Sequence, residues 1–398
     1  MNLRESKLLA EAGELLPAAV RLRRRIHENP ELGLDLPETR AVVLESLEGL
    51  DVEIKRSQKT SGLMVTLHGG KPGATILLRG DMDALPMPED TGLEFASRNA
   101  GRMHACGHDA HTSMLAHAVQ LLDRHRADLR GDVVFMFQPG EEGHRGAKVM
   151  IDEGLLDIEG LEAAFAMHID PRLRVGRVAG KGGAILAAAD SFEVCVRGRG
   201  GHASMPHDAA DPVPVACEIV QALQTFVTRR IDVFDPVVLT VARISAGTAG
   251  NVIPESAELL GTLRSTSERS RKRAQAGIER IARQVAAAHE LEAEVTLREG
   301  YPVTVNDDGF ADFSATVSRD LLGDSAWAQM PNPAMGAEDF SYVLHRVPGA
   351  LVLLGVRPEG SERPAPAHSN RMQLNEDGMR VGIALHAAIA LQYLEGRA

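Results

Sequence analysis

Three short and almost continuously apolar segments constrain the fold of this chain more than any other feature. They cover residues 74–79, 133–137 and 163–167, and stretches with helical periodicity precede and separate them. A strand that is apolar along its whole length is buried on both faces, which is typical of a parallel sheet covered by helices. The sequence therefore predicts an α/β domain built on a mostly parallel sheet.

Polar residues suited to metal binding or acid–base chemistry follow each of these predicted strands. Asp81 and Asp83 come after the first, Glu141 and Glu142 after the second, and His168 after the third. Ligands bind beyond the carboxyl ends of the strands in sheets of this kind. We therefore expect these side chains to share one site.

Further candidate ligands lie in residues 101–111, which read Gly-Arg-Met-His-Ala-Cys-Gly-His-Asp-Ala-His ahead of a predicted helix. The thiolate of Cys106 and the imidazole of His108 favour zinc, cobalt or manganese over calcium or magnesium. By itself, such a Cys-x-His pair is as often structural as metal-binding. Together, the candidates outnumber the ligands of one tetrahedral ion: Cys106, His108, Glu141 or Glu142, His168 and His368. They indicate two neighbouring ions, an arrangement suited to metal-assisted hydrolysis.

The adjacent glutamates Glu141 and Glu142 fit the same chemistry. Two carboxylates do not both ionise in a dry cleft unless a positive charge is near, and metal ions supply that charge. One glutamate can then bind metal while the other takes a proton from water. The alternative is an exposed acidic turn, which the buried strand before the pair disfavours.

Residues 181–299 predict a second domain inserted into the first. After a glycine-rich hinge at 180–183, this segment reads as a strand, a helix, two strands, a helix and a strand. That order is typical of ferredoxin-like domains, and about 115 residues is an ordinary domain size. The first domain is accordingly expected to comprise residues 1–180 and 300–398.

Composition narrows the class of partner. The 398-residue chain has a formal net charge of -12, and aromatic residues make up 4% of it. Nucleic acids attract basic surfaces and single strands stack on aromatic ones, so we expect no nucleic-acid partner. No apolar run reaches membrane-spanning or signal-peptide length. The three cysteines at 106, 195 and 217 do not suggest a disulfide framework, so a cytoplasmic protein without a membrane partner is predicted.

Five motifs spread over nearly the whole chain resemble the M20 metallopeptidase superfamily and, more narrowly, its amidohydrolase subgroup. That subgroup includes hippurate hydrolases, N-acyl-amino-acid hydrolases and plant auxin-conjugate hydrolases. The motifs are Arg-Gly-Asp-Met-Asp-Ala-Leu-Pro at 79–86, Gly-Arg-Met-His-Ala-Cys-Gly-His-Asp at 101–109, Gln-Pro-Gly-Glu-Glu-Gly at 138–143, Gly-Gly-His-Ala-Ser at 200–204 and Gly-Asn-Val-Ile-Pro at 250–254. The resemblance implies a metal-bearing catalytic domain with an inserted lid that also mediates dimerisation.

The resemblance also implies a role for each residue of the metal centre. Two divalent ions, zinc or manganese or else cobalt or nickel, would be held by Cys106, His108, Glu142, His168 and His368. Glu141 matches the general base, which later donates its proton to the leaving amine. Asp83 matches a carboxylate that orients a ligand histidine. The wider superfamily has a histidine at the position of Asp81, so the metal preference of its carboxypeptidase-like members does not transfer to this chain.

Three residues of the inserted domain acquire roles only through the resemblance. His202 matches a histidine that stabilises the tetrahedral oxyanion, often from the partner subunit. Asn251 and Arg264 match groups that bind substrate oxygens or a substrate carboxylate. Without the resemblance, these would be an ordinary loop histidine, a turn residue and a surface charge. A homodimer or higher homo-oligomer formed through the inserted domain is implied as well, and His111 is expected to pack or to orient a ligand rather than to bind metal.

The resulting hypothesis is a metal-dependent amidohydrolase that cleaves an N-acyl amino acid. Within the same class, a dipeptidase or an N-acetyl-diaminopimelate deacetylase fits the motifs, and the sequence does not name the acyl group, the amino acid or the metal. A different class of enzyme would use Cys106 as a nucleophile with a histidine base. A dimeric binding protein without catalysis is a further alternative, but binding alone needs no spare base at Glu141.

Overall fold

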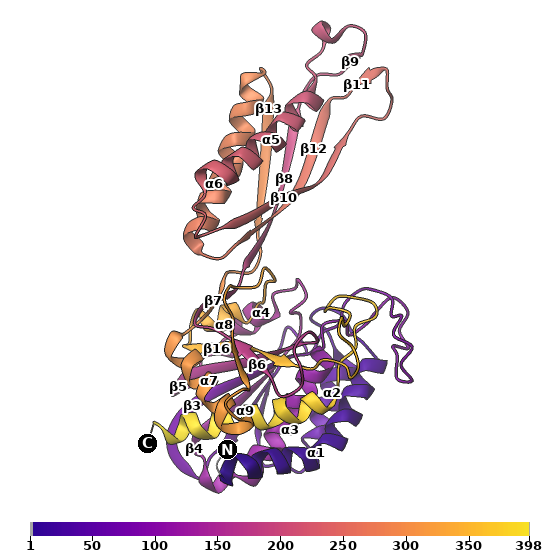
Figure 1. Ribbon diagram of the computed structural model, residues 1–398. Coiled ribbons are helices and arrows are strands. Elements are labelled where there is room, and N and C mark those ends of the chain that lie inside the picture. The colour runs from indigo at the N-terminus through magenta and orange to yellow at the C-terminus, as the bar shows by residue number, and fades with distance from the viewer. Residues whose placement is uncertain (1–2, 398) are drawn as a thin grey trace. The chain divides into compact units, whose positions relative to one another are not determined.

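The computed structural model describes residues 3–397 and confirms the predicted α/β class. The chain forms two compact units (Figure 1). Unit 1 extends to Ile185 and resumes over Val305–Asn332 and from Asp339 onward, whereas unit 2 comprises Leu186–Thr304 and Pro333–Glu338. No sequence pattern indicated the short return of the chain to unit 2 at 333–338.

Unit 1 is built on one large sheet with the strand order β1-β2-β4-β3-β5-β16-β6-β15. The four central strands β4, β3, β5 and β16 run parallel, while β2 and β6 pair antiparallel with this core. The three apolar runs of the sequence form β3, β4 and β5. The strands are β1 (Glu53–Arg56), β2 (Leu63–His68), β3 (Lys71–Asp81), β4 (Arg130–Gln138), β5 (Leu161–Asp170), β6 (Val178–Gly180), β15 (Trp327–Gln329) and β16 (Gly349–Gly355). A separate pair joins β7 (Gly183–Leu186) to β14 (Thr304–Asn306).

The register of the parallel strands collects their carboxyl ends at one end of the sheet. Asp81, the last residue of β3, pairs with Gln138, the last residue of β4. The neighbouring strand β5 runs in the same direction and reaches His168 and Asp170. Residues that follow these strands therefore lie close together.

Helices α1, α3 and α9 pack against one another, and α3 and α9 also contact the central strands. Because α3 lies between the sheet and α1, nearly all of its residues are buried. Helix α2 ends at Ser46, and the chain then turns through Gly49, which has a φ of 83°. The helices are α1 (Leu3–Glu28), α2 (Pro37–Ser46), α3 (His108–Arg124), α4 (Gly146–Asp152), α7 (Asp308–Leu322), α8 (Ser341–Leu344) and α9 (Asp377–Glu395). None of the helices within residues 3–397 is long and apolar enough to cross a membrane.

A buried ion cluster anchors the first turn of α3 to α1. Asp109 accepts a hydrogen bond from Nε of Arg23 at 2.9 Å and contacts Nδ1 of His27 at 2.8 Å. Arg23 also donates to Glu376 at 2.6 Å. Burial disfavours the charged imidazole, but Asp109 outweighs burial and raises the pKa of His27 to about 9. The turn that carries His108 is thus held in place by its neighbour Asp109.

Unit 2 contains a four-stranded antiparallel sheet with the strand order β10-β12-β8-β13. Its elements follow the predicted order of strand, helix, two strands, helix and strand. They are β8 (Ala188–Arg197), α5 (Pro212–Arg230), β10 (Val237–Ala246), β12 (Ser256–Ser265), α6 (Glu268–Ala288) and β13 (Glu292–Glu299). Helices α5 and α6 lie on one face of the sheet (Figure 1) and enclose a core of their own. A small additional pair joins β9 (Gly201–His202) to β11 (Val252–Ile253).

Candidate metal centre

A sharp turn before helix α3 places two candidate ligands next to each other. Gly107, between Cys106 and His108, has a φ of 85°, in the left-handed region that glycine adopts without strain. A Cβ atom at this position would lie 2.5 Å from Cγ1 of Ile169, so space as well as conformation requires glycine. The turn brings the sulfur of Cys106 and the ring of His108 to the carboxyl end of β5.

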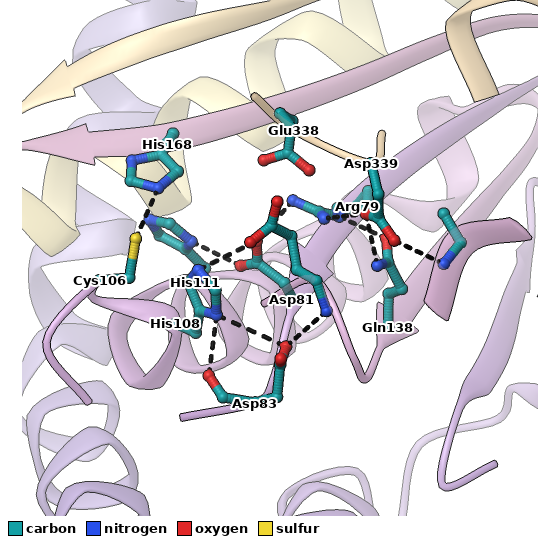
Figure 2. A network of polar contacts seen from close by, with 12 residues as sticks. Arg79, Asp81, Asp83, Cys106, His108, His111, Gln138, His168, Glu338 and Asp339 are labelled. Carbon is teal, nitrogen blue, oxygen red and sulfur yellow. Dashed lines mark hydrogen bonds and ion pairs between the residues drawn. The ribbon is translucent and has the colours of Figure 1, made fainter. Parts of the chain in front are cut away.

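The first group of ligand atoms belongs to Cys106, His108 and His168 (Figure 2), and these atoms all lie within 4.8 Å of one another. Sγ of Cys106 is 3.2 Å from Nε2 of His168. A hydrogen bond from Nδ1 orients each of the two rings. Nδ1 of His108 donates to the Asp83 carbonyl at 2.8 Å, and Nδ1 of His168 donates to the Ile169 carbonyl at 2.7 Å. Nε2 of each ring is thereby the atom presented to the cluster.

The second group combines the same sulfur with Glu142 and His368. Oε1 of Glu142 lies 3.2 Å from Nε2 of His368. The backbone of His368 has a φ of 66°, which costs a non-glycine residue about 1–2 kcal/mol. A hydrogen bond from its N–H to the carbonyl of Ala105, 2.8 Å long, holds it in this conformation beside Cys106. Strained residues of this kind concentrate at functional sites.

Asp83 fixes the loop that carries the two glutamates. Its buried carboxylate accepts hydrogen bonds from the backbone N–H groups of Glu141 and Glu142, each 2.9 Å long. Nδ1 of His108 lies 3.6 Å from the carboxylate, farther than from the Asp83 carbonyl. The residue therefore orients His108 mainly through its backbone, while its side chain holds the glutamates, a role that the sequence did not suggest.

Neighbouring side chains shift the pKa values of the candidate ligands. Burial opposes ionisation of the Cys106 thiol, but His168 and His108 outweigh burial and lower its pKa to about 6. Burial likewise opposes protonation of His168, yet the neighbouring sulfur raises the pKa of that ring to about 9. Hydrogen bonds to Cys106 and Glu142 raise the pKa of His368 to about 10. A divalent cation would replace these protons, as is usual when thiolate and imidazole ligands bind metal.

The residues present fit a pair of divalent ions. Nε2 of His108 is buried and has no hydrogen-bond partner within residues 3–397, which is costly unless another partner takes its lone pair. One sulfur, imidazole nitrogens and carboxylate oxygens are the donors that zinc and similar ions prefer. The two groups of ligand atoms share Cys106, so that one thiolate belongs to both.

A buried arginine connects the ends of β3 and β4 to Asp339 (Figure 2). Arg79 donates to Asp81 at 2.7 Å, to Gln138 at 2.8 Å and to Asp339 at 3.1 Å. Asp339 also accepts from the side chain of Gln138 at 2.7 Å and from the backbone N–H of Ala147 in α4 at 2.9 Å. Burial would raise the pKa of Asp81, but Arg79 outweighs it and holds that pKa well below its usual range.

The sequence alone assigned no role to Arg79, Asp81 or Asp339. One signal was available, because a charged residue at the end of a wholly apolar strand needs a buried partner. Nothing in the sequence identified the partner, since Asp339 lies 260 positions from Arg79.

His111 also contacts Asp81. Its Nδ1 lies 2.6 Å from the Asp81 carboxylate, and burial lowers the pKa of the His111 ring to about 4.

In unit 2, strand pairing brings His202 and Asn251 together. His202 pairs with Val252, and the Asn251 carbonyl accepts from the N–H of Ala203 at 3.1 Å. The backbone N–H of Ser204 donates to Nδ1 of His202 at 3.1 Å. The proton of the neutral ring therefore resides on Nε2, which makes that nitrogen a hydrogen-bond donor.

Arg264 lies far from this pair within unit 2. It is next to the last residue of β12, whereas β11 precedes the first residue of that strand, Ser256. The eight residue steps between Ser256 and Arg264 span roughly 27 Å of extended chain. The unit 2 of one chain thus does not bring Arg264 next to His202 and Asn251.

The chain is similar to known proteins over most of its length. Residues 77–392 match the sequence model of peptidase family M20/M25/M40. IAA-amino acid hydrolase ILR1-like 2 of Arabidopsis thaliana is 40% identical over 99% of this chain and 90% of its own length. N-acetylcysteine deacetylase of Bacillus subtilis is 35% identical over 94% of this chain and 97% of its own length. The crystal structure of a dinuclear metal-binding peptidase of the M20 family, also from Bacillus subtilis, gives a TM-score of 0.84 at 32% identity and covers 96% of this chain and 99% of that chain.

Proposed function

This chain belongs to peptidase family M20/M25/M40 and is a hydrolase of amide bonds, and we propose that it cleaves N-acyl amino acids into a carboxylic acid and an amino acid. One relative hydrolyses an IAA-amino acid and another deacetylates N-acetylcysteine. Both substrates are amino acids joined to a second group. The proposal extends this class of substrate to the present chain without naming the acyl group.

The observation that carries the proposal is the pair of hydrogen bonds by which the Asp83 carboxylate holds the backbone of two adjacent glutamates. Glu142 lies with Cys106 among the candidate ligands. The carboxylate of Glu141 comes within 4.8 Å of the ligand atoms of His108 and Glu142, and the residue as a whole is 6% exposed. One glutamate is thus placed to bind metal and the other to exchange a proton beside it.

Two divalent ions, which we propose to be zinc or manganese, would polarise the substrate carbonyl and make water a better nucleophile. Their proposed ligands are Cys106, His108, Glu142, His168 and His368. Glu141 takes a proton from the water whose oxygen attacks the amide carbon, and it gives that proton to the amine when the carbon–nitrogen bond breaks. The Nε2–H group of His202 donates to the carbonyl oxygen while negative charge accumulates there.

We propose that two copies of the chain contribute to each substrate site. Arg264 and Asn251 are assigned to the substrate carboxylate, and His202 is assigned to the reacting carbonyl. Because roughly 27 Å of β12 separates Arg264 from His202 and Asn251, one unit 2 does not bring all three residues to a small substrate. A second copy that supplies His202 and Asn251 removes this conflict, with unit 2 as the dimerising lid.

The edge strand β10 supports pairing between copies. The sheet order leaves it with one neighbour, and its exposed side chains include Val238 and Ile244, which are 44% and 49% exposed. The opposite edge, β13, instead exposes charged residues such as Glu292 and Glu299. Charged edges resist pairing, whereas apolar edges favour it. A dimer through β10 is therefore part of the proposal.

The alternative mechanism uses Cys106 as a nucleophile, because its sulfur lies 3.2 Å from Nε2 of His168, an arrangement that resembles a nucleophile and its base. Glu142 and His368 lie beside the same sulfur, which fits a role of Cys106 as a metal ligand better than a role as a nucleophile.

Dipeptides and N-acetyl-diaminopimelate remain alternative substrates of the metal enzyme. All three cysteines are free, in keeping with the reducing cytoplasm in which we place the enzyme.

Metal content and hydrolysis measured on one preparation test the function. Elemental analysis is expected to give about two ions per chain. Hydrolysis of a panel of N-acyl amino acids should stop on chelation and return with zinc or manganese. Glu141→Gln should retain the metal and lose about 10²- to 10⁴-fold in kcat, whereas the exposed Glu159→Gln should behave as wild type. Undiminished hydrolysis by chelated protein would instead identify Cys106 as the nucleophile.

Mixing two inactive variants tests the shared site. Glu141→Gln and His202→Ala homodimers are each expected to be inactive. After subunit exchange, a mixed dimer has one site with both an intact Glu141 and an intact His202, so hydrolysis should reappear. No recovery, with exchange verified by mass spectrometry, would mean that each chain uses its own His202.

A further inference from the structure

The ring of His111 packs against the rings of both histidines of the first ligand group. Its centroid is 5.4 Å from that of His108 and 4.8 Å from that of His168, with the rings tilted and edge-on respectively. Residues 108 and 111 are three positions apart in α3, so both rings leave the helix on the same side. His111 therefore touches one candidate ligand from its own helix and another from β5.

Both nitrogens of this ring are committed to hydrogen bonds (Figure 2 shows the one to Asp81). The backbone N–H of Ile169 donates to Nε2 at 2.9 Å. Because a backbone N–H only donates, Nε2 carries no proton, and the proton of the neutral ring resides on Nδ1. Nδ1 donates it to Oδ1 of Asp81 at 2.6 Å. His111 consequently has no lone pair left for a metal ion, although its atoms lie within ligand distance of Asp81 and His108.

Both carboxylate oxygens of Asp81 likewise accept hydrogen bonds. Its second oxygen, Oδ2, accepts from Arg79 at 2.7 Å, and Arg79 in turn bonds Gln138 at the end of β4. Asp81 is the last residue of β3 and is fully buried. A continuous chain of hydrogen bonds thus leads from the ends of β3 and β4 through the ring of His111 to the backbone of β5 directly after His168.

We propose that His111, held by Asp81, is a positioning residue that sets the separation and orientation of His108 and His168. The proposal rests on the proposed function in taking those two histidines as metal ligands. Ile169 is the point of control, because its N–H bonds His111 while its carbonyl accepts from Nδ1 of His168. A shift of this one residue moves the imidazole of His168 relative to Cys106. Groups that orient metal ligands typically change metal affinity or activity 10- to 100-fold when they are replaced.

Two substitutions separate the two bonds of the ring. The amide of His111→Asn reaches about as far as Nδ1, so it retains the contact with Asp81 and loses the acceptor for Ile169. The amide of His111→Gln reaches about as far as Nε2, so it retains the acceptor and loses the contact with Asp81. The control is His117→Gln in the same helix, where the equally buried histidine bonds only the backbone of Ser113 among the described residues.

Zinc affinity and the absorption spectrum of the cobalt-substituted full-length chain are the measurements. Both His111 variants are expected to bind Zn²⁺ about tenfold or more weakly and to shift the ligand-field bands of Co²⁺. The His117→Gln variant should keep wild-type affinity and spectrum even where its melting temperature falls. Affinity within twofold of wild type and unchanged bands in both His111 variants would overturn the proposal. Wild-type protein that binds no metal would instead refute the proposed metal centre itself.

A measurement on the wild-type chain covers the case in which a His111 variant does not fold. Nitrogen-15 NMR of the histidine rings distinguishes a protonated Nδ1 from a protonated Nε2. His111 is expected to carry its proton on Nδ1 both before and after Zn²⁺ binds, since neither nitrogen changes partner. Proton transfer to Nε2, or metal-induced loss of the Nδ1 proton, would exclude the positioning role.

Discussion

Replacing Asp83 by alanine is expected to weaken unit 1 and to disable the metal centre in one step. Its carboxylate accepts from two backbone N–H groups, each at 2.9 Å. Hydrogen bonds to a charged group contribute about 1.5–3 kcal/mol each, so losing both costs about 3–6 kcal/mol. In Asp83→Asn the amide oxygen still accepts one bond, but the amide NH₂ faces the other N–H. About half of the loss is therefore expected for this variant.

Urea unfolding of the metal-free chain measures the stability change, because bound metal would add its own stabilisation. Hydrolysis by the zinc-loaded chain measures the functional change. Asp83→Asn is expected to lower kcat at least about tenfold with a smaller change in KM, since the displaced Glu141 acts in the transition state. Asp128→Asn, an exposed carboxylate in the same unit, should leave both quantities unchanged.

Two results would refute this reasoning. Unfolding of Asp83→Ala within about 0.5 kcal/mol of wild type would mean that the two N–H groups find other partners at no cost. Wild-type kcat in the same variant would mean that the position of Glu141 does not depend on Asp83. Either result would also remove the observation that carries the proposed function.

Three further predictions concern the surroundings of the centre. Gly107→Ala should lose about 2–4 kcal/mol of stability in denaturant unfolding, because alanine is strained at a φ of 85° and its Cβ overlaps Ile169; a loss below 1 kcal/mol would contradict this. Against the effect of burial, Asp109 raises the pKa of His27 from 6.5 to about 9, so protonation of this ring contributes about 3 kcal/mol to the free energy of unfolding. The contribution is fully present below pH 6.5 and is lost as the pH rises through 9. Unfolding free energies between pH 6 and 10 should show this slope in wild type and not in His27→Gln, and equal slopes would refute it. Cys106→Ser should bind zinc at least about tenfold more weakly in chelator competition, and unchanged affinity would exclude the sulfur as a ligand.

The sequence was sufficient to predict the features that depend on local pattern. Buried strands show as apolar runs, and parallel strands bring their carboxyl ends together, so the expectation that Glu142 and His168 belong to one site followed from periodicity alone. His368 was a candidate only for its residue type, since no periodic pattern marks its position, and the family resemblance then implied its role as a ligand.

The remaining features depend on contacts between distant segments. No pattern around Arg79 reveals that its charge is compensated by Asp339, because Asp339 lies 260 positions away and outside any strand or helix. The role of Asp83 was predicted for its carboxylate, whereas the structure gives the contact with His108 largely to its carbonyl. Backbone atoms are the same in every residue, so a sequence does not indicate which of them takes part in a site.

The place of β16 between β5 and β6 has a consequence for synthesis on the ribosome. About 180 residues separate the end of β5 at Asp170 from the start of β16 at Gly349, which takes about 10–40 s to translate. During that interval β5 has no partner on one side, while the whole of unit 2 emerges and can fold on its own core. His368 follows β16, so the nascent chain acquires its last candidate ligand only after this sheet can be completed. A chain stalled before β16 would therefore expose an apolar strand edge, which is the kind of surface that chaperones bind.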